Sequence, residues 1–195
     1  MGFRITKTEG VKEYKVFTHV LADISNGVTI NTSTLTQDTI AEGTPVGLDT
    51  STGLYQIIKT ATLAADAAND ATTYTVKKGH NFKVGDFIML KTAGKSYAIT
   101  AIADNSGNAA YDDITVGTSL GIAASAGDAI LQAKQAGASG SAFPIEIVGL
   151  LGHSYTVEPN LFVQVVTIGQ VRKSRVPDFS GYVSAQLPLI KVVNI

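Results

Sequence analysis

The sequence of 195 residues contains no cysteine and no tryptophan, and only 16% of its residues are charged. Without cysteine there can be no disulfide, no thiolate nucleophile and no cysteine-ligated zinc. The 15 basic and 16 acidic residues nearly cancel, so the charge balance gives no basic footprint for nucleic acid or for an anionic membrane. Globular domains usually have about 25% charged residues, so the low value predicts a surface that is partly covered in an oligomer or assembly.

Long apolar runs and helical periodicity are also scarce. No stretch approaches the roughly 18 apolar residues of a membrane helix, and the first fifteen residues carry several charges where an export signal would be apolar. We therefore expect no membrane partner. Only residues 63–70 and 119–126, which are short and rich in alanine, indicate one or two helical turns.

The sequence does contain repeated apolar alternation with a period of two, interrupted by clusters of Gly, Asn, Asp or Ser. This pattern is typical of strands in an all-β protein. The predicted strands lie at 14–20, 28–30, 55–57, 74–76, 87–89, 97–99, 114–116, around Ile130, and at 145–147, 162–168 and 183–190.

One frame of strand, loop, Gly-Asp turn and strand occurs twice. Thr-Val at 75–76 is followed by Gly-Asp at 85–86, and Thr-Val at 115–116 by Gly-Asp at 127–128. In each copy the glycine permits a positive φ, and the aspartate is placed to accept hydrogen bonds from neighbouring backbone amides. Two such units predict a small barrel.

Two turn-rich passages divide the chain. The first is EGTPVGLDTSTG at 42–53 and the second is QAGASGSAFP at 135–144, a flexible linker. We predict an all-β fold in which residues 1–54 and 136–195 form a discontinuous, β-sandwich-like body. Residues 55–135 are predicted to be inserted in it as a small β-barrel module.

His80 and Asp86 are the first candidates for chemistry, since a His-Asp pair can orient an imidazole for general-base work. The sequence locates no nucleophile for such a base. The favoured interpretation is structural, with His80 at a loop tip, Asp86 in the repeated turn, and Phe82 and Val84 pointing into the core of the module.

His153 stands beside Ser154 and five residues before Glu158, as a catalytic triad might require. Adjacent residues of a strand point to opposite faces, so a surface strand or loop is favoured. The acidic and amide residues at 104–108 and 111–113 lack the frame of a calcium loop and indicate a hairpin turn. We therefore predict no enzymatic activity, no metal site and no cofactor.

The segment from 160 to 175 is apolar on both faces of a predicted strand and ends in a basic cluster. Such a strand normally needs cover on both sides, which a subunit or capsid contact would supply. The predicted interface residues are Phe162, Val163, Val165, Ile168, Arg172, Lys173 and Arg175.

Three longer passages resemble a known family. They are TTYTVKKGHNFKVGDFIML, YDDITVGTSLGIAASAGDAILQA and VEPNLFVQVVTIGQVRKSRVPDFSGYVSAQLPLIKVV. Together with the shorter stretches GTPVGLD, YQIIKTATL and YAITAI, they are similar to parts of the head-fibre and capsid-decoration proteins of tailed phages, particularly phages of Bacteroides-type gut hosts. The resemblance covers the chain from about residue 42 onward. It implies a non-enzymatic virion protein on the capsid surface, a homotrimer anchored to the major capsid protein, with no catalytic residue to transfer.

Two other functions stay open at this point. The module could bind carbohydrate or another surface, with Tyr74, Tyr97 and Tyr111 as stacking platforms. Alternatively, a hydrolase could use His80 or His153. Neither alternative has a motif of the required spacing.

Overall fold

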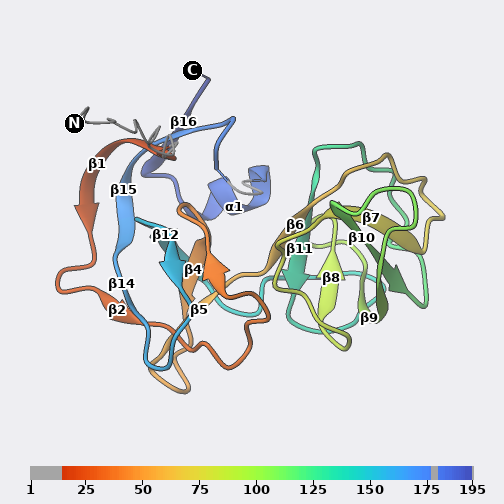
Figure 1. Cartoon of the computed structure of the whole chain (residues 1–195), viewed down its shortest axis with the longest axis horizontal. Helices are drawn as coiled ribbons and strands as arrows, with labels where there is room; N and C mark the ends of the chain where they lie inside the picture. Colours follow the sequence, from red (N-terminus) through yellow and green to blue (C-terminus); the bar gives the residue numbers. More distant parts are fainter. Residues whose placement is uncertain (1–14, 177–179, 195) are drawn as a thin grey trace, which may run out of the picture.

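The computed structural model describes residues 15–176 and 180–194. Strands account for 42% of the chain and helix for 3%, so the predicted all-β class is confirmed. The strands form two six-stranded sheets and two two-stranded sheets. In Figure 1 the six-stranded sheets lie side by side along the long axis of the molecule.

The first six-stranded sheet, called the body sheet, is built from both ends of the chain. Its strands are, in spatial order, β1 (Phe17–Asp23), β15 (Val165–Arg172), β12 (Ile147–Leu151), β4 (Pro45–Leu48) and β5 (Tyr55–Ile57). The sixth, β16 (Ile190–Val193), pairs with β15 in parallel. Two small sheets accompany it, β13 (Tyr155–Thr156) with β3 (Thr39–Ile40) and β14 (Phe162–Val163) with β2 (Val28–Thr29).

The body sheet is apolar on both faces because each face covers a separate core. Neighbouring residues of a strand point to opposite faces. On β15, Val165 packs into the cluster that contains Val28 and Ile40, whereas Val166 packs into a different cluster with Ile190. The strand therefore receives its cover from within the chain, which gives the body two packed layers around one sheet.

The second six-stranded sheet is called the module sheet. Its spatial order is β6 (Thr60–Thr62), β11 (Ala129–Ala133), β8 (Phe87–Met89), β9 (Ser96–Asp104), β10 (Tyr111–Val116) and β7 (Thr73–Lys77). It is not a closed barrel, since its edge strands β6 and β7 meet only at an isolated bridge between Leu63 and Val76. β5, which begins at the predicted boundary of residue 55, pairs with β4 in the body sheet. The division into domains stays a prediction.

The two Gly-Asp turns have the same geometry. Gly85 and Gly127 have φ values of 95° and 94°, a conformation that residues with a Cβ atom rarely adopt. The carboxylates of Asp86 and Asp128 each accept a hydrogen bond of 2.9 Å from the backbone amide three residues earlier. The predicted positive φ of the glycine and the predicted hydrogen bond from a backbone amide to the aspartate are therefore confirmed in both turns.

The pairing pattern extends this correspondence to the strands. β6, β7 and β8 correspond to β9, β10 and β11 in sequence order. The bridge between Leu63 and Val76 then matches the pair Ile99 and Val116. The module sheet thus consists of two similar three-stranded units.

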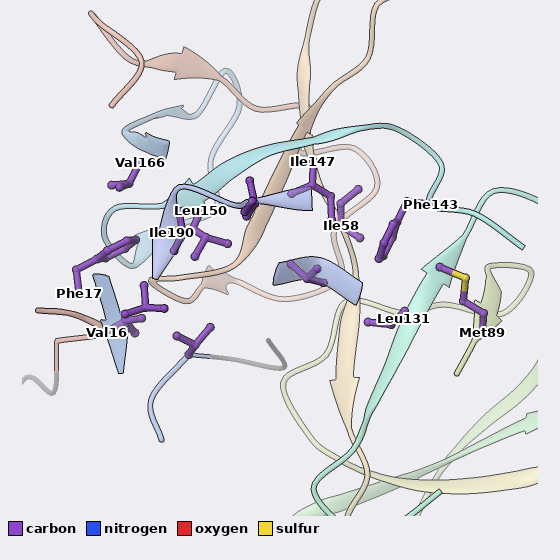
Figure 2. Close-up of a cluster of buried hydrophobic side chains, with 14 of the residues drawn as sticks. Val16, Phe17, Ile58, Met89, Leu131, Phe143, Ile147, Leu150, Val166 and Ile190 are labelled. Atoms are coloured by element: carbon purple, nitrogen blue, oxygen red, sulfur yellow. The ribbon is translucent and has the colours of Figure 1, made fainter. Parts of the chain in front are cut away.

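One hydrophobic cluster crosses from the module sheet to the body sheet. Met89 on β8 and Leu131 on β11 lie opposite each other and are fully buried. They belong to the same cluster as Ile58, Phe143 and Ile147, and Figure 2 shows these side chains between the two sheets. Because both sheets bury apolar surface in one core, each stabilises the other.

Three segments differ from the predicted elements. Neither alanine-rich segment is helical; both consist of bends, turns and irregular backbone, and they pair with each other through a bridge between Ala67 and Ala124. The strand predicted at 183–190 is instead helix α1 (Gly181–Gln186) followed by β16, and the hydroxyl of Ser180 caps the helix by accepting a hydrogen bond from the Val183 amide. Tyr14, in the first predicted strand, lies outside the described residues.

Candidate functional site

A buried ion pair lies where the two sheets approach each other. The ammonium of Lys59, which follows β5, is 2.7 Å from a carboxylate oxygen of Asp86 in the first Gly-Asp turn. Its side chain is only 2% exposed. Burial lowers the pKa of Lys59 from its usual value, and the partner carboxylate opposes this change. The pair therefore joins the module turn to the polypeptide leaving the body sheet.

His80 lies near this pair and is buried as well. Its Nδ1 accepts a hydrogen bond of 3.2 Å from the amide of Phe82, and its Nε2 is 3.4 Å from a carboxylate oxygen of Asp112 on β10. Asp112 also pairs with Lys78, which contacts Asp104. Burial lowers the pKa of His80, although the carboxylate of Asp112 favours the protonated form.

These contacts argue against general-base catalysis at His80. With Nδ1 occupied as an acceptor, the proton of the neutral ring resides on Nε2, which faces Asp112. Neither nitrogen is therefore free to accept a proton from a substrate. Asp86 pairs with Lys59 rather than with the imidazole, so the His80–Asp86 pair considered from the sequence does not form.

His80, which was predicted to lie at a loop tip, is buried because the loop that carries it docks against the body. The side-chain oxygen of the neighbouring Asn81 accepts hydrogen bonds from the amides of Thr36 and Gln37, at 3.1 and 3.2 Å. Phe82 is buried in the module core as predicted, but Val84 is 59% exposed. The polar residues of this loop therefore hold the module and body in register.

The remaining acidic candidates form a hairpin turn. The side-chain amide of Asn105 donates to both oxygens of Asp113, and its carbonyl oxygen accepts from the amides of Gly107 and Asn108. These bonds occupy the groups that a cation would need. Among residues 15–176 and 180–194, no group of three or more acidic or histidine side chains is arranged to hold a metal ion.

His153 and Ser154 do not act together. The hydroxyl oxygen of Ser154 accepts a hydrogen bond of 3.1 Å from the amide of Glu42, and the exposed ring of His153 packs edge-on against Tyr155. Neither contact orients a nucleophile. The triad interpretation therefore has no geometric basis.

The proposed tyrosine platforms are only partly available. Tyr74 is fully buried, where its hydroxyl donates to the carbonyl of Ala71 and accepts from the amide of Leu120. Burial raises its pKa. Tyr97 and Tyr111 are half-buried. Tyr74 cannot stack on a ligand, which weakens the carbohydrate-binding alternative.

The predicted interface residues separate into two groups. Val163 and Val165 are fully buried in the body core of the single chain and present no surface there to a partner. Phe162 is 60% exposed, and Lys173 is also exposed. Ile168, Arg172 and Arg175 are half-buried.

A cleft of about 680 Å³ separates the module sheet from the segment that follows β15. Its described lining includes residues on both sides, among them Lys77 and Lys91 of the module and Lys173 of the body. Asp128 of the second Gly-Asp turn also lines it. Sequence inspection missed this site because its residues are brought together only by the packing of the two sheets.

Lys59 was also missed, and Asp112, considered only as part of the 111–113 acidic cluster, was not linked to His80. The one available signal for Lys59 was a single charge in the apolar run YQIIKTATL at 55–63. Such a lysine needs a buried partner, but nothing in the sequence indicates that the partner is Asp86. Contacts of this kind follow from strand order and not from local spacing.

In comparisons with protein-family models, curated proteins and solved structures, nothing matches this chain. Within the described part of the chain, no helix has the length and apolar character needed to cross a membrane.

Proposed function

We propose that this protein is a structural component of a phage virion, a head fibre or capsid-decoration protein anchored to the major capsid protein. The observation that carries the proposal is the resemblance of the chain from about residue 42 onward to such proteins. Three passages at 72–90, 111–133 and 157–193 carry that resemblance. The proposed role is non-enzymatic, and the proposed location is the capsid surface.

The candidate site supports this role. The buried polar groups Lys59 and His80 are engaged in contacts within the chain: Lys59 pairs with Asp86 where the chain leaves the body sheet, and His80 contacts Phe82 and Asp112 inside the module. A protein whose buried polar groups hold its own segments in place is suited to a structural role. Enzymes instead leave such groups accessible to a substrate.

The surface also offers apolar side chains for self-association. β1 is an edge strand of the body sheet, and Leu21 on it is 67% exposed. Phe162 on β14 is 60% exposed, with its ring over Gly27. Exposed apolar edge strands are common sites of strand pairing between chains. We propose that this side of the body forms the homotrimer contact.

The oligomer is tested by native mass spectrometry of the purified chain at micromolar concentration. We expect a species of three times the 20.3 kDa chain mass, which Leu21→Lys combined with Phe162→Ser converts to monomer. The matched control is Val84→Lys, which changes an equally exposed apolar residue of the module and should leave the trimer intact. A native chain that is already monomeric contradicts the proposed contact.

The class of protein is tested by sequencing the neighbourhood of the gene. Flanking genes for capsid, portal and packaging proteins are the expected result. Flanking genes of a carbohydrate-degrading pathway would instead favour the carbohydrate-binding alternative.

A further inference from the structure

The cleft between the module sheet and residues 173–176 and 180–182 is lined by positive charge together with a few apolar side chains. Lys77, Lys91 and Lys173 line it, and Asp128 is the single acidic residue in its described lining. None of the three lysine side chains forms an ion pair with any residue that the structure describes. The described lining therefore carries an excess of positive charge without internal partners.

The surroundings of the two Gly-Asp turns differ: the aspartate of the first turn is covered by the chain itself, whereas the aspartate of the second turn borders the cleft. At the first turn, the carboxylate of Asp86 is covered by the ammonium of Lys59. At the second turn, the equivalent Asp128 accepts a hydrogen bond from the amide of Ser125 and is exposed at the cleft. The fold thus closes one of two similar surfaces with its own chain and leaves the other open.

The lining favours an extended peptide over a phosphate-bearing ligand. Small residues line part of the cleft, including Ala123, Ala124 and Gly127, and leave room for a backbone, while Ile122 and Tyr182 offer apolar contacts. No arginine is among the described lining residues, so the planar fork that grips phosphate bidentately is missing. Lysine ammonium groups can pair with carboxylates as point charges.

We propose that this cleft binds an acidic peptide segment of a partner protein in an extended conformation. The carboxylates of the segment pair with Lys77, Lys91 and Lys173, and its apolar side chains lie against Ile122 and Tyr182. The volume of about 680 Å³ is within the range of ligand pockets in proteins, about 300–1,000 Å³. The proposal goes beyond the virion role, since it holds for any partner that carries such a segment.

The absence of native cysteine allows a reporter to be placed at one site. Ser174 lines the cleft and is exposed, so Ser174→Cys labelled with an environment-sensitive dye reports occupancy. Ser106→Cys, in the β9–β10 hairpin, serves as the control position. The probe is an eight-residue peptide in which glutamate alternates with valine, blocked at both ends. Its comparison peptide replaces every glutamate with glutamine.

We expect a saturable signal from the glutamate peptide at the cleft position alone, and weaker binding as salt rises. Lys77→Gln, Lys91→Gln and Lys173→Gln together should weaken binding about tenfold, the sum of three exposed charge contacts. The matched control replaces the exposed Lys83, Lys134 and Lys191, which lie outside the lining, and should retain full affinity.

Several results would overturn the proposal. They are equal binding of the glutamine peptide, equal loss in the control triple variant, or no saturable signal at millimolar peptide. If inorganic phosphate bound saturably at the labelled cleft and the glutamate peptide gave no signal, the site would be assigned to phosphate ligands instead. Because no capsid is present, these outcomes are independent of the virion proposal.

Discussion

At the scale of single residues, one charged side chain is buried among the described residues. Lys59 and Asp86 form a pair whose lysine is almost completely buried. Removing water from an ammonium is costly, and its carboxylate partner offsets that cost only while both groups are present. The pair therefore fixes which module turn meets the end of β5. Loss of either partner should lower the stability of the fold.

Asp86→Asn is predicted to lower the free energy of unfolding by about 3 kcal/mol, because it leaves the Lys59 ammonium buried without a counter-charge. Asp128→Asn is the matched control: the same turn and the same backbone hydrogen bond are affected, but no buried lysine is present. We expect it to cost about 1 kcal/mol. Urea unfolding measures both changes.

A second substitution separates the stranded charge from the lost hydrogen bond. Lys59→Met in the Asp86→Asn background should recover most of the stability, because it removes the unpaired ammonium. If the single Asp86→Asn and Asp128→Asn variants were equally stable, the buried pair would have no special energetic role.

The buried imidazole of His80 predicts a pH dependence of stability. Burial lowers its pKa below 6.5 in the folded protein, so the unfolded chain binds a proton at higher pH than the folded protein does. Stability is therefore fully present above pH 6.5 and declines as pH falls from 6.5 toward the folded pKa, with a maximum slope of about 1.4 kcal/mol per pH unit. The carboxylate of Asp112 raises the pKa of His80 and so opposes the effect of burial, whereas the ammonium of Lys59 lowers that pKa further.

Unfolding by urea between pH 7.5 and 5 measures this slope. His80→Gln should flatten it, whereas His153→Gln should not, because His153 is exposed. A wild-type slope that persisted in the His80→Gln variant would assign the titration to another group.

At the scale of elements, the paired Gly-Asp turns are the most informative feature. Both glycines have positive φ, and a Cβ atom added to either one would meet no neighbouring atom within 4 Å. The requirement for glycine is therefore conformational and not steric. The same reasoning applies to both copies, although the side chains around them differ.

Gly85→Ala and Gly127→Ala are each predicted to destabilise the protein by about 1 kcal/mol, the cost of a left-handed conformation for a residue with a Cβ atom. Gly117→Ala is the control, because that glycine is not in the positive-φ region and its added methyl group would make an ordinary 3.9 Å contact with Thr100. Thermal unfolding measures the three variants. An equal loss of stability at all three positions would show that the φ angle does not determine the destabilisation.

Sequence patterns could predict the elements but not their long-range partners. The alternation at 74–76, 87–89 and 114–116 predicts strands because local side-chain direction suffices for it. The strand predicted at 183–190 failed because apolar residues there serve helix α1 as well as β16. The two alanine-rich segments are not helical because each supplies backbone hydrogen-bond partners to the other, through Ala67 and Ala124.

The candidate site was less predictable than the fold. The role of Asp86 in a turn could be predicted, because a Gly-Asp pair between two strands is a local sequence signal for a turn. Its pairing with Lys59 spans 27 residues, and the contact of His80 with Asp112 depends on which strand lies beside β7. The three cleft lysines come from three different strand ends, so only the packed structure reveals them.

At the scale of the whole molecule, the two sheets share one core, and we expect them to unfold together. Leu131 is fully buried in the cluster that joins them. Leu131→Ala should cost about 3 kcal/mol and lower the unfolding midpoint of both sheets equally. With no native tryptophan, Tyr97→Trp in the module and Tyr182→Trp in the body are separate reporters. Two transitions with different midpoints would contradict the shared core.

The proposed decoration of a phage capsid is tested most directly by binding of the chain to capsids. Purified chain is mixed with capsids assembled from the major capsid protein encoded beside its gene, and the bound copies are counted after sedimentation. We expect saturable co-sedimentation in multiples of three chains. A chain that stays entirely in the supernatant at micromolar concentration, while the capsids are intact, would contradict it.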